Sequence, residues 1–278
     1  MEVSAGEIEY IRQGVEQDIR NDGRSCTDYR EFTVLTDVIP HANGSARVKL
    51  GSTDVLVAVN AELAEPDSGA LDVGRIVCSV ECAPSASLDF EGRGAEVLNT
   101  QLTSVLERML QDSNAVNLRK LCVIPGKQCW VLYVDALVLD SSGNLFDAVS
   151  LAAKAALRLT TIPAVKVLSG PDGQQEIDVS DDPFDAQPLG DDNVPISVSL
   201  VRIGNRFVVD PSLEEEQCAA GRVSVSVTRQ GRLAGVHKSD VGGIAPVTLL
   251  QTIQVRPCRG LSEWTTCCGV VAAAIYRL

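Results

Sequence analysis

The sequence predicts an α/β or α+β fold with mixed sheets, built as two successive lobes of which the second is smaller. Strand-like and helix-like segments alternate along the chain, and a stretch rich in Asp, Gly, Pro and Gln over 169–193 divides them into two groups. The length of 278 residues is enough for a sizeable core, and 45% hydrophobic and 22% charged residues are ordinary for a soluble globular protein. We therefore expect a globular protein with two lobes.

The clearest strand pattern lies at residues 44–59. Apolar and basic side chains alternate up to position 50, which is the period of a strand with one buried face. Turn-forming residues follow at 51–54, and the segment 55–59 contains no polar side chain. This pattern predicts a hairpin whose second arm is covered on both faces, while Arg47 and Lys49 on the first arm point outward.

The remaining elements of the first lobe are predicted from the spacing of apolar residues. Residues 4–19 predict an amphipathic helix capped at its start, and residues 31–38 alternate as a strand. Further along the chain we expect strands at 76–82, 118–124 and 130–140, a helix with the stripe Leu98, Leu102, Val105 and Met109, and an alanine-rich helix at 144–159 that ends before Pro163.

The second lobe is predicted to consist mainly of strands, at 194–200 and 206–209 and in a hairpin of 223–227 with 233–237. Apolar residues near the end of the chain, at 267–276, are too few to span a bilayer. The resulting division is an N-terminal helix and arm at 1–28, lobe 1 at 29–168, an acidic linker at 169–193, lobe 2 at 194–254 and a divergent tail at 255–278.

The formal net charge of −13 is concentrated in one region. Between positions 171 and 216 there are twelve acidic residues against Arg202 and Arg206, a local net charge of −10, so the rest of the chain carries −3. A strongly acidic protein repels a phosphate backbone and gains little from the release of counterions. Acting alone, this chain is expected to bind RNA poorly.

Cysteine and histidine usage argues against disulfides and metal. The nine cysteines are scattered, and no secretory signal or run of about 18 apolar residues is present, so reduced thiols in an intracellular protein are expected. The two histidines, His41 and His237, do not lie near a Cys-x-x-Cys pair. We expect no metal site, no cofactor and no membrane contact.

Three short motifs follow one another along the chain: Asp22-Gly23-Arg24, the segment Asp28-Tyr29-Arg30 and the Gly-Ser-Ala-Arg hairpin that begins at Gly44. In this order they resemble the RNase PH family, and specifically its ring subunits in the RNA exosome. The resemblance covers roughly residues 8 to 254. It implies two similar β-α lobes packed against each other, with six such subunits closing into a ring.

The resemblance also implies where chemistry would occur. Active members of the family use inorganic phosphate, held by a Gly-Ser-Arg or similar element at the start of the alanine-rich helix, together with an acidic residue early in the second lobe. Here the first position reads Gly143-Asn144-Leu145, and a leucine cannot bind phosphate; Asn144 is interpreted as a helix cap. The second position, 217–222, has no carboxylate, and 214–216 is interpreted as a solvated helix start. No catalytic residue is therefore predicted.

The other motifs of the sequence resemble those of the non-catalytic branch of the eukaryotic ring subunits. This branch implies partners: other RNase PH-like subunits in a hetero-hexameric ring, S1/KH cap proteins, a hydrolytic exonuclease, and RNA in the assembled channel. It also implies a location in the nucleus, nucleolus and cytoplasm, and a role in 3'-to-5' RNA processing and decay. Arg93 and Arg108 are the RNA-binding candidates, each weighed against an ordinary surface arginine, whereas Arg24 and Arg47 are expected to pair with carboxylates or a ring neighbour.

Two other functions stay open at the level of sequence. The first is an active phosphate-dependent 3'-to-5' exoribonuclease, against which Leu145 and the missing carboxylate argue. The second is a stand-alone metabolic enzyme on a related fold, for which no nucleotide-binding Gly-rich loop is present.

Overall fold

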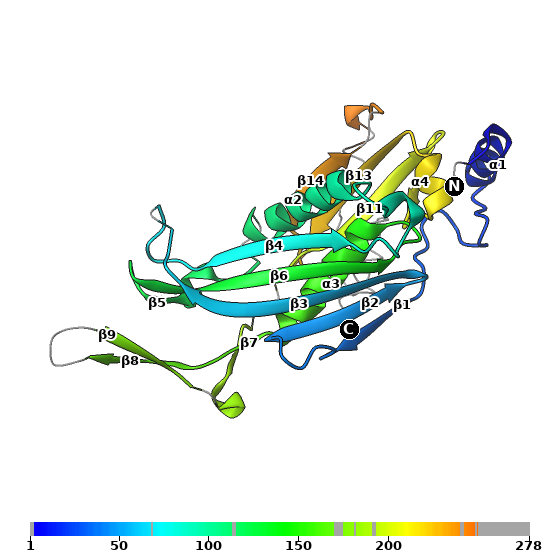
Figure 1. Ribbon diagram of the computed structural model, residues 1–278. Helices are drawn as coiled ribbons and strands as arrows, with labels where there is room; N and C mark the ends of the chain where they lie inside the picture. The colour runs from blue at the N-terminus through cyan, green and yellow to red at the C-terminus, as the bar shows by residue number, and fades with distance from the viewer. Residues whose placement is uncertain are drawn as a thin grey trace, which may run out of the picture.

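The chain folds into two sheets that enclose a layer of helices, as seen in the computed structural model (Figure 1). The structure describes residues 3–67, 69–112, 115–169, 175–180, 182–190, 193–239, 242–247 and 249. The proposed tail at 255–278 lies outside the described residues. One continuous apolar core joins residues of both sheets to the helices between them. Among the described parts of the chain, no helix is long and apolar enough to cross a membrane.

The larger sheet has six strands in the order β1-β2-β3-β6-β4, with β5 also paired to β6. All pairs are antiparallel except β4 with β6, so the sheet is mixed as predicted. The bounds of these strands are β1 Phe32–Thr36, β2 Gly44–Leu50, β3 Thr53–Ala64, β4 Arg75–Cys82, β5 Cys122–Ile124 and β6 Gln128–Asp140.

Two long helices cover one face of this sheet. Helix α3 (Leu145–Leu159) packs on β2 and β3, and α2 (Glu96–Asp112) packs on β4. Close packing of α3 is possible because its alanines bring the helix near the strands, and Ala148, Ala152 and Ala156 are completely buried. The predicted positions of both helices are confirmed.

The prediction that the second hairpin arm is covered on both faces is wrong for the described chain. Val55, Val57 and Val59 of β3 are fully buried against the helix layer. Leu56 and Ala58, which point the other way, are only partly buried, because no described helix packs on that side of the sheet. The absence of polar residues in this strand therefore does not mean a second covering layer within the chain.

The smaller sheet has four antiparallel strands in the order β12-β11-β13-β14. Its strands are β11 Ile196–Ile203, β12 Arg206–Val209, β13 Gly221–Val227 and β14 Leu233–Ser239, and the short helix α4 (Leu213–Gln217) links β12 to β13. The second predicted hairpin is thus confirmed, and its sheet contacts both α3 and α2.

The N-terminal helix α1 (Ala5–Glu16) forms as predicted, with a capping box between Ser4 and Glu7. Its buried residues Ile11 and Val15 belong to a small apolar cluster with residues of β11 and β12. The helix ends earlier than expected, because Asp18 adopts a positive φ of 62°.

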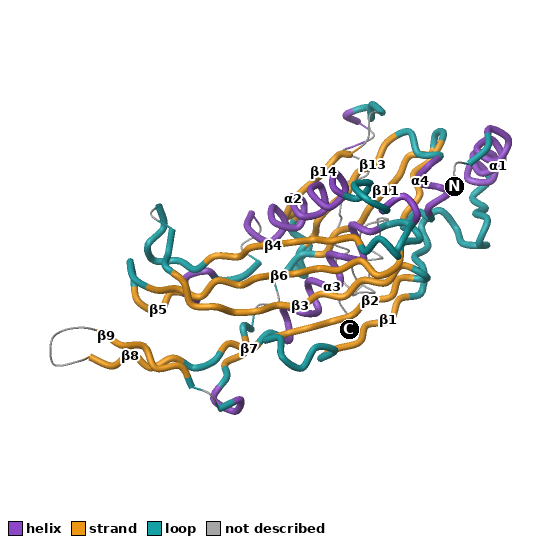
Figure 2. The backbone as a smooth tube through the Cα atoms, in the orientation of Figure 1, coloured by secondary structure: helices purple, strands orange, loops and turns teal. Residues whose placement is uncertain are grey.

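Two segments differ from the sequence-based expectations. The predicted strand at 118–124 begins as a 3-10 helix (Leu118–Leu121), and only β5 is extended. The region at 169–193 also contains regular structure. β9 (Gln175–Val179) pairs with β8 (Val165–Ser169) in a two-stranded ribbon that extends away from the larger sheets in Figure 2. β10 (Gln187–Pro188) pairs with β7 (Thr161–Ile162). The remaining short 3-10 helices span Leu88–Phe90 and Pro183–Asp185.

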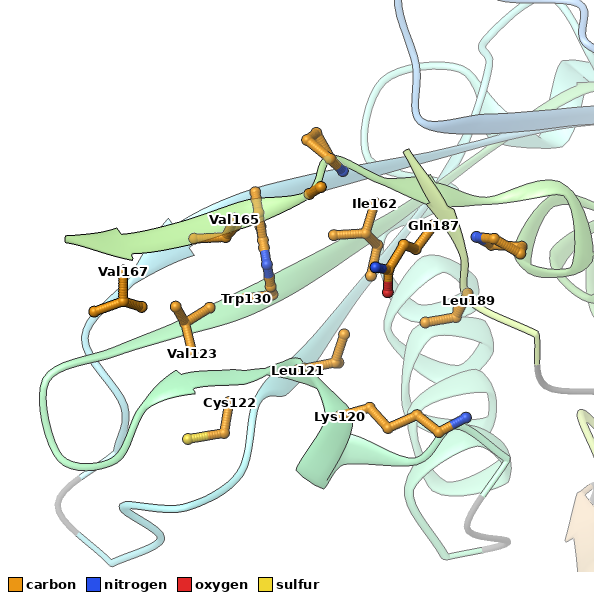
Figure 3. A pocket seen from close by; sticks show the side chains of 13 residues that line it. Lys120, Leu121, Cys122, Val123, Trp130, Ile162, Val165, Val167, Gln187 and Leu189 are labelled. Carbon is orange, nitrogen blue, oxygen red and sulfur yellow. The ribbon is translucent and has the colours of Figure 1, made fainter. Parts of the chain in front are cut away.

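A pocket of about 320 Å³ lies where β5 and β6 approach the β7–β8 segment. Figure 3 shows the Trp130 side chain between Val165 and Ile162, with Leu121 below it in this view and the Lys120 side chain extending away from it. None of the described lining residues is a carboxylate or a histidine, so this pocket does not present an acid–base pair.

Candidate functional site

The start of helix α3 is where the resemblance described above leads us to expect an anion in phosphate-using proteins. Asn144 precedes the helix in the left-handed conformation, at φ 56° and ψ 47°. Its side chain makes no capping bond, because Nδ2 instead donates to Asp147 Oδ2 at 2.8 Å and Asp210 Oδ1 at 2.7 Å. The predicted cap position is therefore correct, and the predicted capping role of the side chain is wrong.

A carboxylate from the second lobe already occupies this position. Glu216 Oε1 accepts the backbone N–H of Asn144 at 2.9 Å and pairs with Arg222 Nη2 at 2.7 Å. The Arg222 guanidinium in turn lies 5.5 Å above the ring of Phe146, in cation–π geometry. Helix N-termini attract negative charge, and here the chain supplies that charge itself.

The backbone around this carboxylate is closely packed. Gly143 has φ 97°, and a Cβ at this position would lie 2.7 Å from the backbone nitrogen of Leu213. The Leu213 N–H donates to the carbonyl of Ser142 at 3.1 Å, which fixes the start of α4 against the start of α3. Leu145, the first residue of α3, is only 6% exposed, so its side chain is part of the core rather than of a binding loop.

Asp210 lies beside this position and joins the N-terminal arm to both lobes. Its Oδ1 pairs with Arg30 Nη2 at 2.8 Å, and its Oδ2 pairs with Arg24 Nη1 at 3.0 Å. Burial alone would raise the pKa of Asp210, but hydrogen bonds and charge from Arg30, with a further bond from Asn144, outweigh it and lower that pKa. The carboxylate is therefore held ionised, as a structural anion.

Asp147, on the first turn of α3, is fully buried and behaves differently. Its Oδ2 accepts bonds from Tyr29 Oη, from Asn144 Nδ2 and, at 3.0 Å, from the backbone N–H of Ser199. Burial raises the pKa of Asp147 to about 6, and these bonds offset only part of that effect. Burial, followed by the charges of Asp147 and Asp210, raises the pKa of Tyr29 well above its usual value.

The acidic run at 214–216 is not simply a solvated helix start. Glu215 is 5% exposed, and its two carboxylate oxygens accept bonds from Arg20 Nε at 2.8 Å and Nη2 at 2.5 Å. Arg20 also donates to the carbonyls of Asp28, Val209 and Asp210. The prediction of solvated glutamates is therefore wrong for Glu215, because α4 turns this side chain toward the arginine of the arm, and for Glu216, which pairs with Arg222.

The two predicted RNA-binding arginines lie away from this buried site, on α2 and the turn before it. The Arg93 side chain is 90% exposed and lies 3.4 Å from Glu96. Arg108 is exposed beside a hollow of about 260 Å³ between α2 and β14, which His237 also lines. Burial lowers the pKa of His237, and the nearby charge of Arg108 lowers it further, so the imidazole is neutral at physiological pH.

The structure also places the arginines that were expected to be structural. Arg24 pairs with Asp22 at 2.6 Å as well as with Asp210, and Arg47 pairs with Asp54 at 2.6 Å. Both predictions of carboxylate pairing are confirmed. Among the described residues, no group of three or more His, Cys, Asp or Glu side chains is arranged to hold a metal ion.

The sequence did not predict that Arg20, Arg30, Asp210 and Glu216 meet in space. The available signal was the density of arginines near the N-terminus, three between positions 20 and 30. A solvated segment does not need so many cations. Three arginines so close in sequence indicate carboxylate partners elsewhere in the chain, and Asp210 and Glu215 are those partners.

The two-lobed arrangement of sheets around α2 and α3 is that of RNase PH-like proteins. The chain belongs to the 3' exoribonuclease (RNase PH) family: residues 28–163 match its domain 1 and residues 193–255 match its domain 2. The family predicted from the short motifs is thus confirmed.

Similar proteins from other organisms carry exosome names. The chain is 40% identical to the exosome protein RRP42 of Dictyostelium discoideum, over 90% of this chain and 92% of that protein. It is 38% identical to the exosome complex component Rrp42 of Thermococcus kodakarensis, over 89% and 88%. Among solved structures, a chain of the Archaeoglobus fulgidus exosome with RNA bound to the active site matches with a TM-score of 0.77 and 31% identity, covering 89% of this chain and 92% of that one.

Proposed function

We propose that this chain is a non-catalytic ring subunit of an RNA exosome, which scaffolds the complex and helps to channel RNA for 3'-to-5' processing and decay. The similarity to Rrp42 proteins across almost the whole chain supports membership of an exosome core. The likeness to a chain of an archaeal exosome supports the same conclusion.

The observation that carries the non-catalytic assignment is Glu216 at the start of α3. Its carboxylate accepts the Asn144 N–H and pairs with Arg222, which supports the proposal that the chain's own carboxylate takes the position expected for a phosphate. An incoming phosphate would have to displace that anion and approach Glu216 against like-charge repulsion. The buried Leu145 supplies neither a hydroxyl nor a guanidinium to compensate.

The alternative function is an active phosphate-dependent 3'-to-5' exoribonuclease. It is favoured by one observation, that the name of the Dictyostelium relative describes an exosome exonuclease. A phosphorolysis assay separates the two functions: the purified chain is incubated with single-stranded RNA and inorganic phosphate, and nucleoside diphosphate release is measured. We expect no release above a no-protein blank. Release that depends on both phosphate and protein would overturn the non-catalytic assignment.

Arg93 and Arg108 are proposed to contact RNA in the assembled channel rather than in the isolated chain. The net charge of −13 disfavours RNA binding by the chain alone, whereas two exposed arginines can guide a strand held by other subunits. The test is photo-crosslinking of RNA to the assembled complex. The double variant R93A/R108A should lose crosslinks to this chain, whereas Arg12→Ala, which removes an exposed arginine of α1, should retain them. Equal crosslinking of all three proteins would contradict the proposal.

The proposed partners are other RNase PH-like subunits in a hetero-hexameric ring, S1/KH cap proteins and a hydrolytic exonuclease, and the proposed location is the nucleus, nucleolus and cytoplasm. The proposed division keeps lobe 1 at 29–168 and lobe 2 at 194–254, with the arm at 1–28, the linker at 169–193 and the tail at 255–278. Affinity purification of the tagged protein from its own cells tests the partners. Recovery of the protein alone, or only as a homo-oligomer, would overturn the scaffold function.

A further inference from the structure

The face of the larger sheet that points away from α2 and α3 has an unusual composition; we call it the outer face. One row of side chains crosses it from β1 to β4 in strict register, and it consists of Leu35, Arg47, Leu56, Leu137 and Glu81. The next row consists of Ser45, Ala58, Asp135 and Ser79, and a third contains Asn60, Tyr133 and Val77.

The centre of the outer face is more apolar than a solvated sheet face requires. An antiparallel sheet with one wet face normally alternates apolar with polar side chains. Here Leu56, Ala58 and Leu137 occupy neighbouring outward positions on β3 and β6, and all three are only partly buried. Together with Ile39 they line a hollow of about 340 Å³. No described helix packs against it.

The charge of the outer face is uneven, and this decides what can bind there. On the β2 side, Arg47 and Lys49 lie 2.6 and 3.6 Å from Asp54, so the basic charge there is largely compensated within the chain. On the β4 side, Glu81 and Asp135 border the apolar hollow, and no described cation lies within ion-pair distance of either.

The proton affinity of Asp135 reflects its place on the outer face beside Glu81. Partial burial raises the pKa of Asp135, and the negative charge of Glu81 raises it further. A cation placed between them would relieve this repulsion, and it would have apolar side chains immediately beside it. A phosphate backbone would instead be repelled, so RNA does not fit this face.

We propose that the outer face is a docking surface for another protein chain, whose contact surface presents an arginine or lysine surrounded by aliphatic side chains. The basic residue would lie between Glu81 and Asp135, and the aliphatic side chains would fill the hollow beside Leu56 and Leu137. The centre of a protein interface is desolvated and more apolar than its rim, and arginine is enriched there, so an arginine among apolar contacts is compatible with such a centre. This inference rests on the proposed function in one respect, because the partner is taken to be a chain of the same complex.

The first test is carboxylate footprinting with a water-soluble carbodiimide and an amine, followed by mass spectrometry. The isolated chain and the complex purified through a tag on this chain are labelled in parallel. Labelling of Glu81 and Asp135 should fall about fivefold or more in the complex, since the centre of an interface excludes water. The loop carboxylate Asp67, whose side chain is 68% exposed, serves as the reference for labelling outside the outer face. Unchanged labelling of both residues in the complex would overturn the docking surface.

The second test measures partner recovery with charge variants. In E81K/D135K, recovery of the docked chain should fall about tenfold or more, because like charges across an interface cost several kcal/mol. The neutral variant E81Q/D135N should lose less, and the matched variant D67K should bind as the wild type does. Thermal unfolding of each isolated variant checks that it is folded. Equal recovery with E81K/D135K would overturn the basic partner.

The outcomes separate this inference from the proposed function. If the wild-type chain recovers RNase PH-like subunits while Glu81 and Asp135 remain fully labelled, only the docking surface is overturned. If the wild-type chain purifies alone and both residues remain labelled, both proposals are overturned. Protection of the two residues in the isolated chain at high concentration would identify a second copy as the occupant and would overturn the basic partner.

Discussion

Carboxylates at the start of α3 are compensated by partners within the chain, whereas, in the described part of the chain, those beside the hollow on the outer face of the larger sheet are not. At the start of α3, Asp210 and Glu216 each have arginine and N–H partners from within the chain. On the outer face, Glu81 and Asp135 border an apolar hollow with no such partner among the described residues. The first region is closed to small anions by its own side chains, whereas the second is suited to another macromolecule. The functions proposed for the chain accordingly rest on surfaces rather than on a pocket.

The largest expected effect is at the closed region. Asp210→Ala leaves Arg24 and Arg30, which are mostly buried, without their shared carboxylate, and breaking such a pair costs about 3–5 kcal/mol of unfolding free energy. Urea denaturation of the variant and the wild type measures this loss. The control is Asp67→Ala, which removes an exposed pair with Arg75 and should cost about 1 kcal/mol or less. Similar losses of unfolding free energy for both variants would show that the ion pairs of Asp210 stabilise the fold no more than an exposed pair does.

The next prediction concerns the pH dependence caused by Asp147. Its folded pKa of about 6 lies above the ordinary 3.8, so the folded state binds the proton more tightly than the unfolded state does. The contribution is therefore full below the ordinary pKa and is lost as the pH rises through about 6, by about 3 kcal/mol in total, at 1.36 kcal/mol for each pKa unit. Asp147→Asn should lack this component when urea denaturation is repeated between about pH 4 and pH 7. Parallel pH profiles for the two proteins would contradict it.

A smaller effect is expected for Glu216→Gln. The amide oxygen can still accept the Asn144 N–H, but Arg222, whose side chain is 12% exposed, loses its ionic partner, so we expect a loss of about 1–3 kcal/mol. Glu214→Gln, on the same short helix but exposed, should change stability by about 0.5 kcal/mol or less. Urea denaturation measures both. The Glu216→Gln variant should still show no phosphorolytic activity, because Leu145 remains. Activity gained from this single change would mean that Glu216 alone prevents phosphate binding.

The smallest effect is expected on the outer face. Leu35 is 48% exposed on β1, so Leu35→Lys in the isolated chain should change the unfolding free energy by about 0.5 kcal/mol or less. Thermal unfolding of the isolated protein checks this value. A loss as large as that of Asp210→Ala would show that the outer face is part of the core rather than an open surface, and the contrast between the two regions would fail.

Much of the fold was predictable because it depends on local periodicity. Helix α3 follows from its alanine-rich stripe, and the β2–β3 hairpin follows from its alternating side chains and its turn. In β9, Ile177 and Val179 also alternate with polar residues, but the surrounding Asp, Gly and Pro led to an interpretation as linker. The loop-like composition of the whole 25-residue region therefore concealed the local strand pattern of β9.

The site was less predictable because its contacts are distant in sequence. Nothing in the run of three glutamates shows that Glu215 faces Arg20, 195 positions earlier, while Glu214 faces solvent. Likewise, the all-apolar segment of β3 looked the same whether its second face met a helix, solvent or another chain. Local patterns identify which residues are in a strand, and only the assembled fold decides what each face contacts.

The N-terminal arm contacts residues that are far away in the sequence, and this separation limits when those contacts can form during synthesis. Arg20 and Arg30 are made early, whereas Glu215 and Asp210 are 195 and 180 positions later. At about 5–20 residues per second, a ribosome needs about 10–40 s to supply those partners. During that interval Arg20, Arg24 and Arg30 have none of their second-lobe carboxylates available. Their contacts with the second lobe can therefore form only after that lobe has emerged from the ribosome.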